Sequence, residues 1–301
     1  MDEAAAAPAG QVAIDENDLP AAGRGRMRLF RRSARPAPGG PPVCARVAIL
    51  PGYGDHAGRY DHVLRWLAAR GVAADALDFR GHGRAAGRRG SVARWDEYLE
   101  DLDVFLNVLN DAENAAAVPL FLLGQSHGCL VICAAAVQGR LDRVPVAGTV
   151  LCSPYLGSRI VVPPAPERLA RIADRLVPWL PVPSKVASNW LYEDAALRAL
   201  DDADTLANRT ATPRWYLSTL RVQAETRARA EHFRLPLLLV LGDADPISDL
   251  DAARAFVERA GSPDKTVQTY AGYRHETLRE SGRQTVLSDI LAWLRARVPT
   301  A

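Results

Sequence analysis

The chain has 301 residues, 48% of them hydrophobic and 24% charged, and can bury the core of one large domain or of a domain with a subdomain. Its net charge of +2 argues against a dedicated nucleic-acid binder. No apolar run approaches the roughly 18 residues that cross a bilayer, and the N-terminus lacks the basic start and apolar core of a signal peptide.

Residues 1–20 are rich in alanine, proline and acidic side chains, which predicts a mobile N-terminal segment. Beyond them, β-like runs alternate with helical patterns. These runs lie near residues 25–30, 43–50, 72–79, 119–123, 146–152, 235–241 and 266–270. Strands that alternate with helices predict an α/β fold with a mostly parallel sheet of about eight strands, covered by helices on both faces.

Six arginines cluster at the start of this region: Arg24, Arg26, Arg28, Arg31, Arg32 and Arg35. They could form a patch for anionic head groups. We favour the alternative, a strand with solvated arginines, because charge runs are usually exposed surface.

The interval between residues 153 and 233 contains no convincing core strand. A structureless loop of that length is implausible in a compact domain, so we predict a helical cap over residues 154–233, inserted between core segments 21–153 and 234–301. Within it, Leu169, Ile172 and Leu176 follow helical spacing and are expected to pack the cap onto the body. An alternative is that the apolar residues of the cap receive an acyl chain. The candidate substrate-binding residues are Ile160, Val161, Trp179 and Leu180.

Ser126 lies at the centre of the sequence Gly124-Gln125-Ser126-His127-Gly128, between an apolar run and the helix-like stretch 129–137. This pattern is typical of a nucleophile elbow, in which a strained turn exposes a serine at the end of a sheet. The flanking glycines let the strand and the helix approach without side-chain clashes. Ser126 is therefore the candidate nucleophile.

A serine nucleophile requires a histidine base and an acid that orients it, in the chain order serine, acid, histidine. Asp245 follows the apolar run 235–241 and His275 follows the run 266–270, so both lie on loops after strands. We favour Asp245 as the acid, although an aspartate in such a loop is often a helix cap. The alternatives are Asp243, Asp249 and Asp251. The remaining histidines are expected to be hydrogen-bonded or exposed.

An oxyanion requires backbone N–H donors beside the nucleophile. The N–H of His127 stands at a predicted helix N-terminus and is one candidate. The other candidate is the N–H of Tyr53, in the glycine-rich turn 51–60 after the run 43–50. The alternative is that this turn only joins a strand to a helix.

Five features together resemble the monoacylglycerol lipase and lysophospholipase-like branch of the α/β-hydrolases, the serine aminopeptidase S33 type. They are the turn 52–60, the stretch 78–84 with 87–90, the elbow, residues 242–245 and the pair His275-Glu276. The resemblance spans about residues 26–297. Departures occur at Pro51, Ala85 and Cys129, and none of them removes a catalytic group.

The resemblance implies an α/β-hydrolase fold with a triad of Ser126, Asp245 and His275. It also implies an oxyanion hole formed by Tyr53 and His127, a cap around the substrate pockets, and carboxylic esters with one long acyl chain as substrates. Monoacylglycerols and lysophospholipids are such esters. The alcohol moiety and the acyl length are left open.

Two other functions were weighed. Gly52, Gly54 and Gly58 follow a strand-like run and Asp78 ends the next one, as in a NAD(P)-dependent oxidoreductase, but the G-x-G-x-x-x-G spacing departs from the dinucleotide fingerprint. A non-catalytic ligand-binding protein on a hydrolase scaffold is the other alternative, because a fold alone does not fix a function. The hydrolase accounts for all the features together.

The four cysteines lie in apolar contexts without metal-ligand spacing: Cys44, Cys129, Cys133 and Cys152. This is typical of reduced core cysteines in a cytoplasmic protein. We expect no metal and no cofactor. The expected partner is a small-molecule or lipid ester and not a nucleic acid; peripheral membrane contact through the cap and the oligomeric state are left open.

Overall fold

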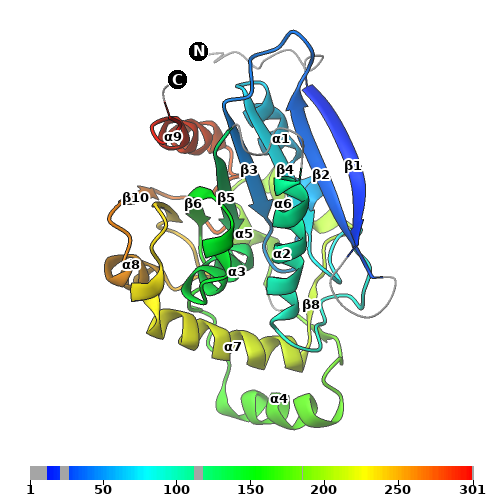
Figure 1. The fold of residues 1–301 in the computed structure, drawn as a ribbon. Coiled ribbons are helices and arrows are strands. Elements are labelled where there is room, and N and C mark those ends of the chain that lie inside the picture. The colour runs from blue at the N-terminus through cyan, green and yellow to red at the C-terminus, as the bar shows by residue number, and fades with distance from the viewer. Residues whose placement is uncertain (1–11, 21–26, 112–117, 185, 300–301) are drawn as a thin grey trace.

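The computed structural model describes residues 12–20, 27–111, 118–184 and 186–299. Within these ranges, eight strands form one sheet in the order β1-β2-β4-β3-β5-β6-β9-β10 (Figure 1). β2 pairs antiparallel with β1 and β4, and the other neighbouring strands are parallel. The strands are β1 (Val12–Pro20), β2 (Arg28–Pro36), β3 (Ala45–Leu50), β4 (Val72–Asp78), β5 (Leu120–Gln125), β6 (Val146–Cys152), β9 (Leu237–Gly242) and β10 (Lys265–Tyr270). The predicted mostly parallel sheet is confirmed.

Helices cover both faces of the sheet. α1 (Asp61–Ala68) and α9 (Arg283–Arg295) pack on one face, and α2 (Glu97–Asn110), α3 (His127–Val137) and α8 (Leu250–Arg259) pack on the other. Successive side chains of a central strand enter opposite cores, as Ala48 and Ile49 do. Because both faces are buried, the central strands are continuous apolar runs rather than alternating ones.

The predicted mobile segment 1–20 is wrong for residues 12–20, which form β1 at the edge of the sheet. Residues 1–11 lie outside the described residues. The acidic side chains of β1 find partners on β2: Asp18 pairs with Arg28, and Glu16 pairs with Arg32. Leu19 is buried in the core. The strand is therefore held by contacts that its own composition does not reveal.

The arginine cluster is a strand, as we favoured, but its members are paired rather than merely solvated. Arg32 also contacts Asp61, and Arg35 binds both carboxylate oxygens of Asp75 at 2.9 and 2.8 Å. Arg24 and Arg26 lie outside the described residues. The pairing leaves little free positive charge on β2 for an anionic ligand.

The described residues of segment 154–233, which we call the cap, form four α-helices, a short 3-10 helix and a small two-stranded sheet. The α-helices and strands are α4 (Pro164–Leu176), β7 (Val182–Pro183), α5 (Ser188–Leu191), α6 (Ala195–Ala203), β8 (Thr210–Ala211) and α7 (Pro213–Ala228). Figure 1 shows α7 crossing below α3, with α4 packed farther out.

The expectation that an apolar stripe packs α4 onto the body is wrong. Leu169, Ile172 and Leu176 are 65%, 53% and 70% exposed. α4 instead meets α7 through an ion pair between Asp174 and Arg214. The apolar stripe itself faces outward.

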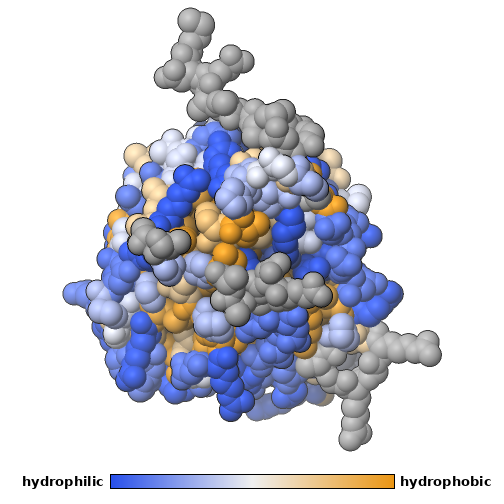
Figure 2. All heavy atoms as spheres, turned by 45° about the horizontal axis from the view of Figure 1, so that its top comes forward, coloured by the Kyte–Doolittle hydropathy of each residue, from blue (hydrophilic) through white to orange (hydrophobic). Residues whose placement is uncertain are grey.

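No helix among the described residues combines the length and apolarity needed to cross a bilayer. The face turned forward in Figure 2 is mostly hydrophilic, with apolar residues visible in small areas between charged ones. All four cysteines are free; Cys129, Cys133 and Cys152 are buried, and Cys44 is half-buried.

Candidate active site

Ser126 stands between β5 and α3 with φ of 51° and ψ of −110°, a conformation that non-glycine residues rarely adopt. A Cβ at Gly124 would lie 2.6 Å from Cys129 N, and one at Gly128 would lie 2.0 Å from Leu50 O. The strand and the helix can therefore meet only because both positions are glycine. The strand, the strained turn and the helix that the sequence predicts around Ser126 are all present.

Asp245 and His275 meet on the loops after β9 and β10. Nδ1 of His275 lies 2.8 Å from Oδ2 of Asp245, and both side chains are buried. Oδ1 of Asp245 accepts hydrogen bonds from the N–H groups of Ile247 at 2.7 Å and Ser248 at 3.1 Å. The carboxylate is thus fixed on both of its oxygens.

Pairing shifts the pKa of each residue in the direction that favours its charged form. Burial by itself lowers the pKa of His275, but the charge and hydrogen bond of Asp245 outweigh it and raise that pKa above the usual 6.5. Burial likewise acts to raise the pKa of Asp245, and the charge and hydrogen bond of His275 reverse this, so that the pKa is lowered. The imidazole is therefore a stronger base than a free histidine.

The alternative acids have other contacts. Asp249 caps α8 through the N–H groups of Asp251 and Ala252, and Asp243 accepts a hydrogen bond from the N–H of Gly272. Asp251 is exposed. Among the alternatives weighed, the structure brings only Asp245 to His275.

The other histidine side chains lie apart from this pair. His62 contacts the carbonyl of Leu278, His82 contacts that of Arg80, His56 pairs with Asp204, and His232 is exposed. Burial lowers the pKa of His62 and of His82 to about 4.

The side chain of His127 is buried behind the elbow. Five aromatic rings surround its imidazole, from Tyr53, Phe79, Trp95, Tyr98 and Trp215. Neither ring nitrogen has a hydrogen-bond partner among the described residues, and burial lowers the pKa to about 3. The side chain is therefore neutral and packs among these rings. Its backbone N–H, in contrast, stands at the first residue of α3.

The candidate oxyanion donors are unoccupied by protein acceptors. Within the described part of the chain, the N–H groups of Tyr53 and His127 donate no hydrogen bond. A Cβ at Gly52, the residue before Tyr53, would lie 3.5 Å from Ser126 Cβ, so the turn passes directly beside the elbow. Both N–H groups are thus available near Ser126.

Ser126 and His275 line one cavity of about 360 Å³. Among the described residues, no hydrogen bond joins their side chains, and such contacts often tighten only when substrate binds. Of the predicted substrate-binding residues, only Ile160 lines this cavity. Val161 is 85% exposed, and Trp179 and Leu180 are about half exposed. Ile160 and Val162 both line the cavity, so the side chain of Val161 between them faces the other way.

The glycine-rich turn 52–60 and Asp78 have structural roles that do not require a dinucleotide. Asp78 is buried, and its carboxylate accepts hydrogen bonds from the N–H groups of Ala57 at 2.5 Å and Arg84 at 2.7 Å. This aspartate closes the turn, and its buried carboxylate is not presented to a ribose.

Several lining residues were not indicated by the sequence. They surround Arg59 and include Asp55, Asp201, Asn208, Arg209 and Glu276. Burial and the charge of Asp55 raise the pKa of Glu276. Asp55 and Glu276 stand in the turn 52–60 and in the pair His275-Glu276, which the sequence marks. Asp201, Asn208 and Arg209 carry no such signal, since they are cap residues that meet the core only in the folded chain.

Comparisons with known proteins show which proteins this chain resembles. A family model described as serine aminopeptidase, S33, matches residues 41–282. A monoacylglycerol lipase of Mycolicibacterium smegmatis is 29% identical over 249 residues, which are 82% of this chain and 87% of that protein. A monoglyceride lipase of Mus musculus is 28% identical over 280 residues, covering 91% and 88% of the two chains.

Solved structures give the same fold. The monoacylglycerol lipase of Paleococcus ferrophilus superimposes with a TM-score of 0.79 at 25% identity, covering 90% of this chain and all of the other. A soluble variant of monoglyceride lipase from Saccharomyces cerevisiae reaches a TM-score of 0.83 at 21% identity, covering 94% and 97%. The α/β-hydrolase fold that the sequence predicts is confirmed.

Proposed function

The chain belongs to the serine aminopeptidase S33 family, and we propose that it hydrolyses carboxylic esters of the monoacylglycerol or lysophospholipid type through an acyl-enzyme on Ser126. The observation that carries this proposal is the shared cavity. A serine in a strained elbow and a histidine paired with a buried carboxylate face the same space.

In the proposed mechanism, His275 takes the proton of Ser126 as the serine oxygen attacks the ester carbonyl. The N–H groups of Tyr53 and His127 hold the oxyanion of the tetrahedral intermediate. The intermediate collapses, the ester C–O bond breaks, and His275 returns the proton to the departing alcohol. A water molecule, deprotonated by His275, then attacks the acyl-enzyme and releases the acid.

The lining of the cavity supports an ester with an apolar acyl chain. Ile160, Val162, Leu191, Leu220 and Ile247 contribute apolar surface, which favours burial of hydrocarbon. Relatives named monoacylglycerol or monoglyceride lipase support the same substrate class.

We also propose that the exposed stripe of α4 contacts a lipid surface, where such substrates reside. Leu169, Ile172 and Leu176 project from a helix whose other exposed residues include Arg168 and Arg175. An apolar face edged by arginines is typical of an interfacial helix. Co-sedimentation with vesicles should be reduced by Ile172→Asp, and equal binding by this variant would contradict the contact.

The decisive experiment is labelling with a fluorophosphonate probe, followed by peptide mass spectrometry. An adduct on Ser126, lost in Ser126→Ala together with ester hydrolysis, is expected. Ser218→Ala is the matched control, because Ser218 lies on α7 and donates to the carbonyls of Arg214 and Trp215. Wild-type hydrolysis by Ser126→Ala would overturn the proposal. Tight binding of an ester without turnover would favour the ligand-binding alternative.

A further inference from the structure

We propose that the cap segment 201–215 positions the oxyanion donor Tyr53, with Asp204 as a positioning residue. The turn carrying Tyr53 would then be competent only while this segment is seated on it. The inference rests on the proposed function, because it concerns the donor assigned there.

The side chain of Tyr53 is held by the cap as well as by the core. Its ring stacks on that of Trp215, with centroids 3.6 Å apart. Its hydroxyl shares its proton between the carbonyl oxygens of Thr210, at 2.9 Å, and Gly90, at 2.8 Å. Two of these three contacts come from the cap and one from the core.

The backbone after Tyr53 is held by the same segment. The N–H of Asn208 donates to the carbonyl of Gly54 at 2.8 Å. Gly54 has φ of +82°, and a Cβ there would lie 2.4 Å from the carbonyl oxygen of Asn208. The two backbones therefore touch directly, so a shift of the cap segment must move the peptide next to the donor.

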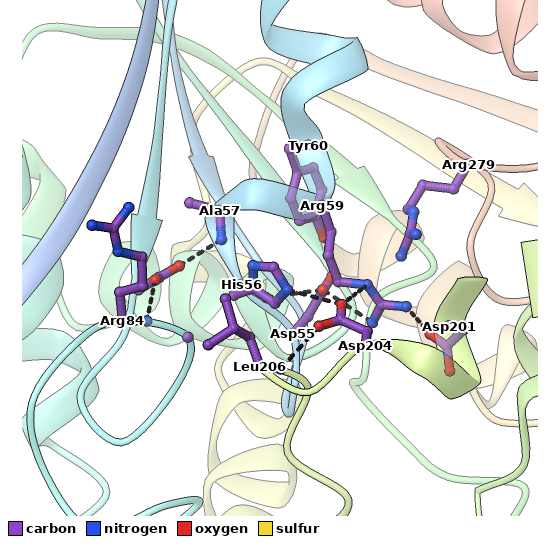
Figure 3. Close-up of polar contacts among 12 residues, drawn as sticks. Asp55, His56, Ala57, Arg59, Tyr60, Arg84, Asp201, Asp204, Leu206 and Arg279 are labelled. Atoms are coloured by element: carbon purple, nitrogen blue, oxygen red, sulfur yellow. Dashed lines mark hydrogen bonds and ion pairs between the residues drawn. The ribbon is translucent and has the colours of Figure 1, made fainter. Parts of the chain in front are cut away.

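A charged network fixes the far side of the turn to the cap (Figure 3). Arg59 pairs with Asp55 of the turn and with two cap residues, Asp201 and Asp204. Oδ2 of Asp204 also lies 2.9 Å from Nε2 of His56. The network thus joins both halves of the turn to the end of α6 and the residues after it.

The core side of the turn is anchored independently. Asp78 accepts hydrogen bonds from the N–H groups of Ala57 and Arg84. This anchor holds the turn at Ala57, whereas the cap contacts lie at residues 53–56 and at Arg59. Weakening the cap contacts should therefore loosen the donor without unfolding the turn.

Asp204 is the best position for a test because it is the least buried acid of the network, with 19% of its side chain exposed against 4% for Asp55 and 1% for Asp201. Asp204→Asn keeps the shape and the acceptor for the N–H of Leu206. It removes the charge that His56 and Arg59 face. Asp202→Asn is the matched control, since Asp202 is an exposed neighbour that binds Ser188.

Two readouts are needed. We expect backbone amides of residues 52–60 to exchange hydrogen at least about fivefold faster in Asp204→Asn than in Asp202→Asn. We also expect kcat for a monoacyl ester to fall about tenfold while KM changes less than about twofold, since an oxyanion donor acts in the transition state. Tyr53→Phe, which removes the hydroxyl contacts but keeps the N–H, should reproduce the fall in kcat.

Unchanged exchange or unchanged kcat in Asp204→Asn would overturn the inference. A rise in KM at constant kcat would also overturn it, because Asp204 would then act in substrate binding. Failure of the wild type to label at Ser126 would contradict the proposed function instead, and the exchange rates would still report whether the cap seats the turn.

Discussion

Nδ1 of His275 lies 2.8 Å from Oδ2 of Asp245, so the acid both orients the imidazole and raises its pKa. The base must be neutral to accept a proton, and activity should fall as pH drops below this raised pKa. In Asp245→Asn burial is opposed only by the charges of Glu276 and Asp55, so the acid limb of the kcat/KM profile should move to lower pH. We expect kcat to fall by up to about 10⁴-fold.

Rates measured between pH 5 and 9 on one ester would test this shift. Asp243→Asn, which changes an aspartate two residues away, should keep the wild-type profile. An Asp245→Asn enzyme with an acid limb at the wild-type pH would show that another group governs the base.

Gly128→Ala should destabilise the fold, because the added Cβ would lie 2.0 Å from Leu50 O, an atom of a central strand that cannot easily move. We expect a loss of about 3 kcal/mol or more in urea unfolding. Gly39→Ala controls for backbone strain alone: it has φ of +83° but open space, and should cost only about 1 kcal/mol. Equal losses in the two variants would refute the steric explanation.

His127→Met should preserve activity and reduce sensitivity to acid. The folded-state pKa of His127, about 3, lies below the 6.5 of an unfolded histidine. Its contribution to stability is therefore complete above pH 6.5 and is lost as the pH falls toward 3, by about 1.4 kcal/mol per unit. A thioether fills irregular space between aromatic rings and needs no hydrogen bond.

The measurement is the difference in unfolding free energy between pH 7 and pH 5. This difference should be smaller by about 2 kcal/mol in His127→Met, and unaltered in the exposed control His232→Met. Loss of ester hydrolysis in His127→Met would mean that the imidazole, and not only the backbone N–H, serves the reaction.

Ile160→Trp should shift the preference toward shorter acyl chains, because Ile160 lines the cavity that Ser126 faces. We expect kcat/KM for the longest accepted ester to fall about tenfold or more, with short esters little affected. Val161→Trp is the adjacent control, since Val161 is 85% exposed. A uniform loss across chain lengths would instead indicate a distorted site.

The fold was predictable where local pattern and burial coincide. β3, β4, β5 and β9 are short apolar runs buried on both faces, so the sequence identifies them directly. β1 was missed because its acidic side chains gain partners only beside the arginines of β2. The spacing on α4 revealed an apolar stripe but not its direction, because α4 meets α7 through the contact of Asp174 with Arg214, 40 residues away in the chain.

The candidate site was likewise predictable only in part. The loops that hold Ser126, Asp245 and His275 could be located from chain order and strand ends, because those follow from the sheet. The residues that line the cavity could not be located in this way. Ile160 lines the cavity, whereas its neighbour Val161 is exposed. Ile160 and Val162 face the cavity and Val161 faces solvent, and the three side chains are too alike in composition for the sequence to tell which of them face inward.

β1 closes one edge of the sheet by bonding to β2 along its whole length. A trimmed protein that begins at residue 21, the natural choice from composition, would bare the N–H and C=O groups of β2 beside the apolar Leu29 and Phe30. An uncovered strand of this kind is a template for pairing with another chain. The acidic strand β1 therefore covers the backbone groups of β2. Its removal should yield molecules that associate through the exposed edge of β2.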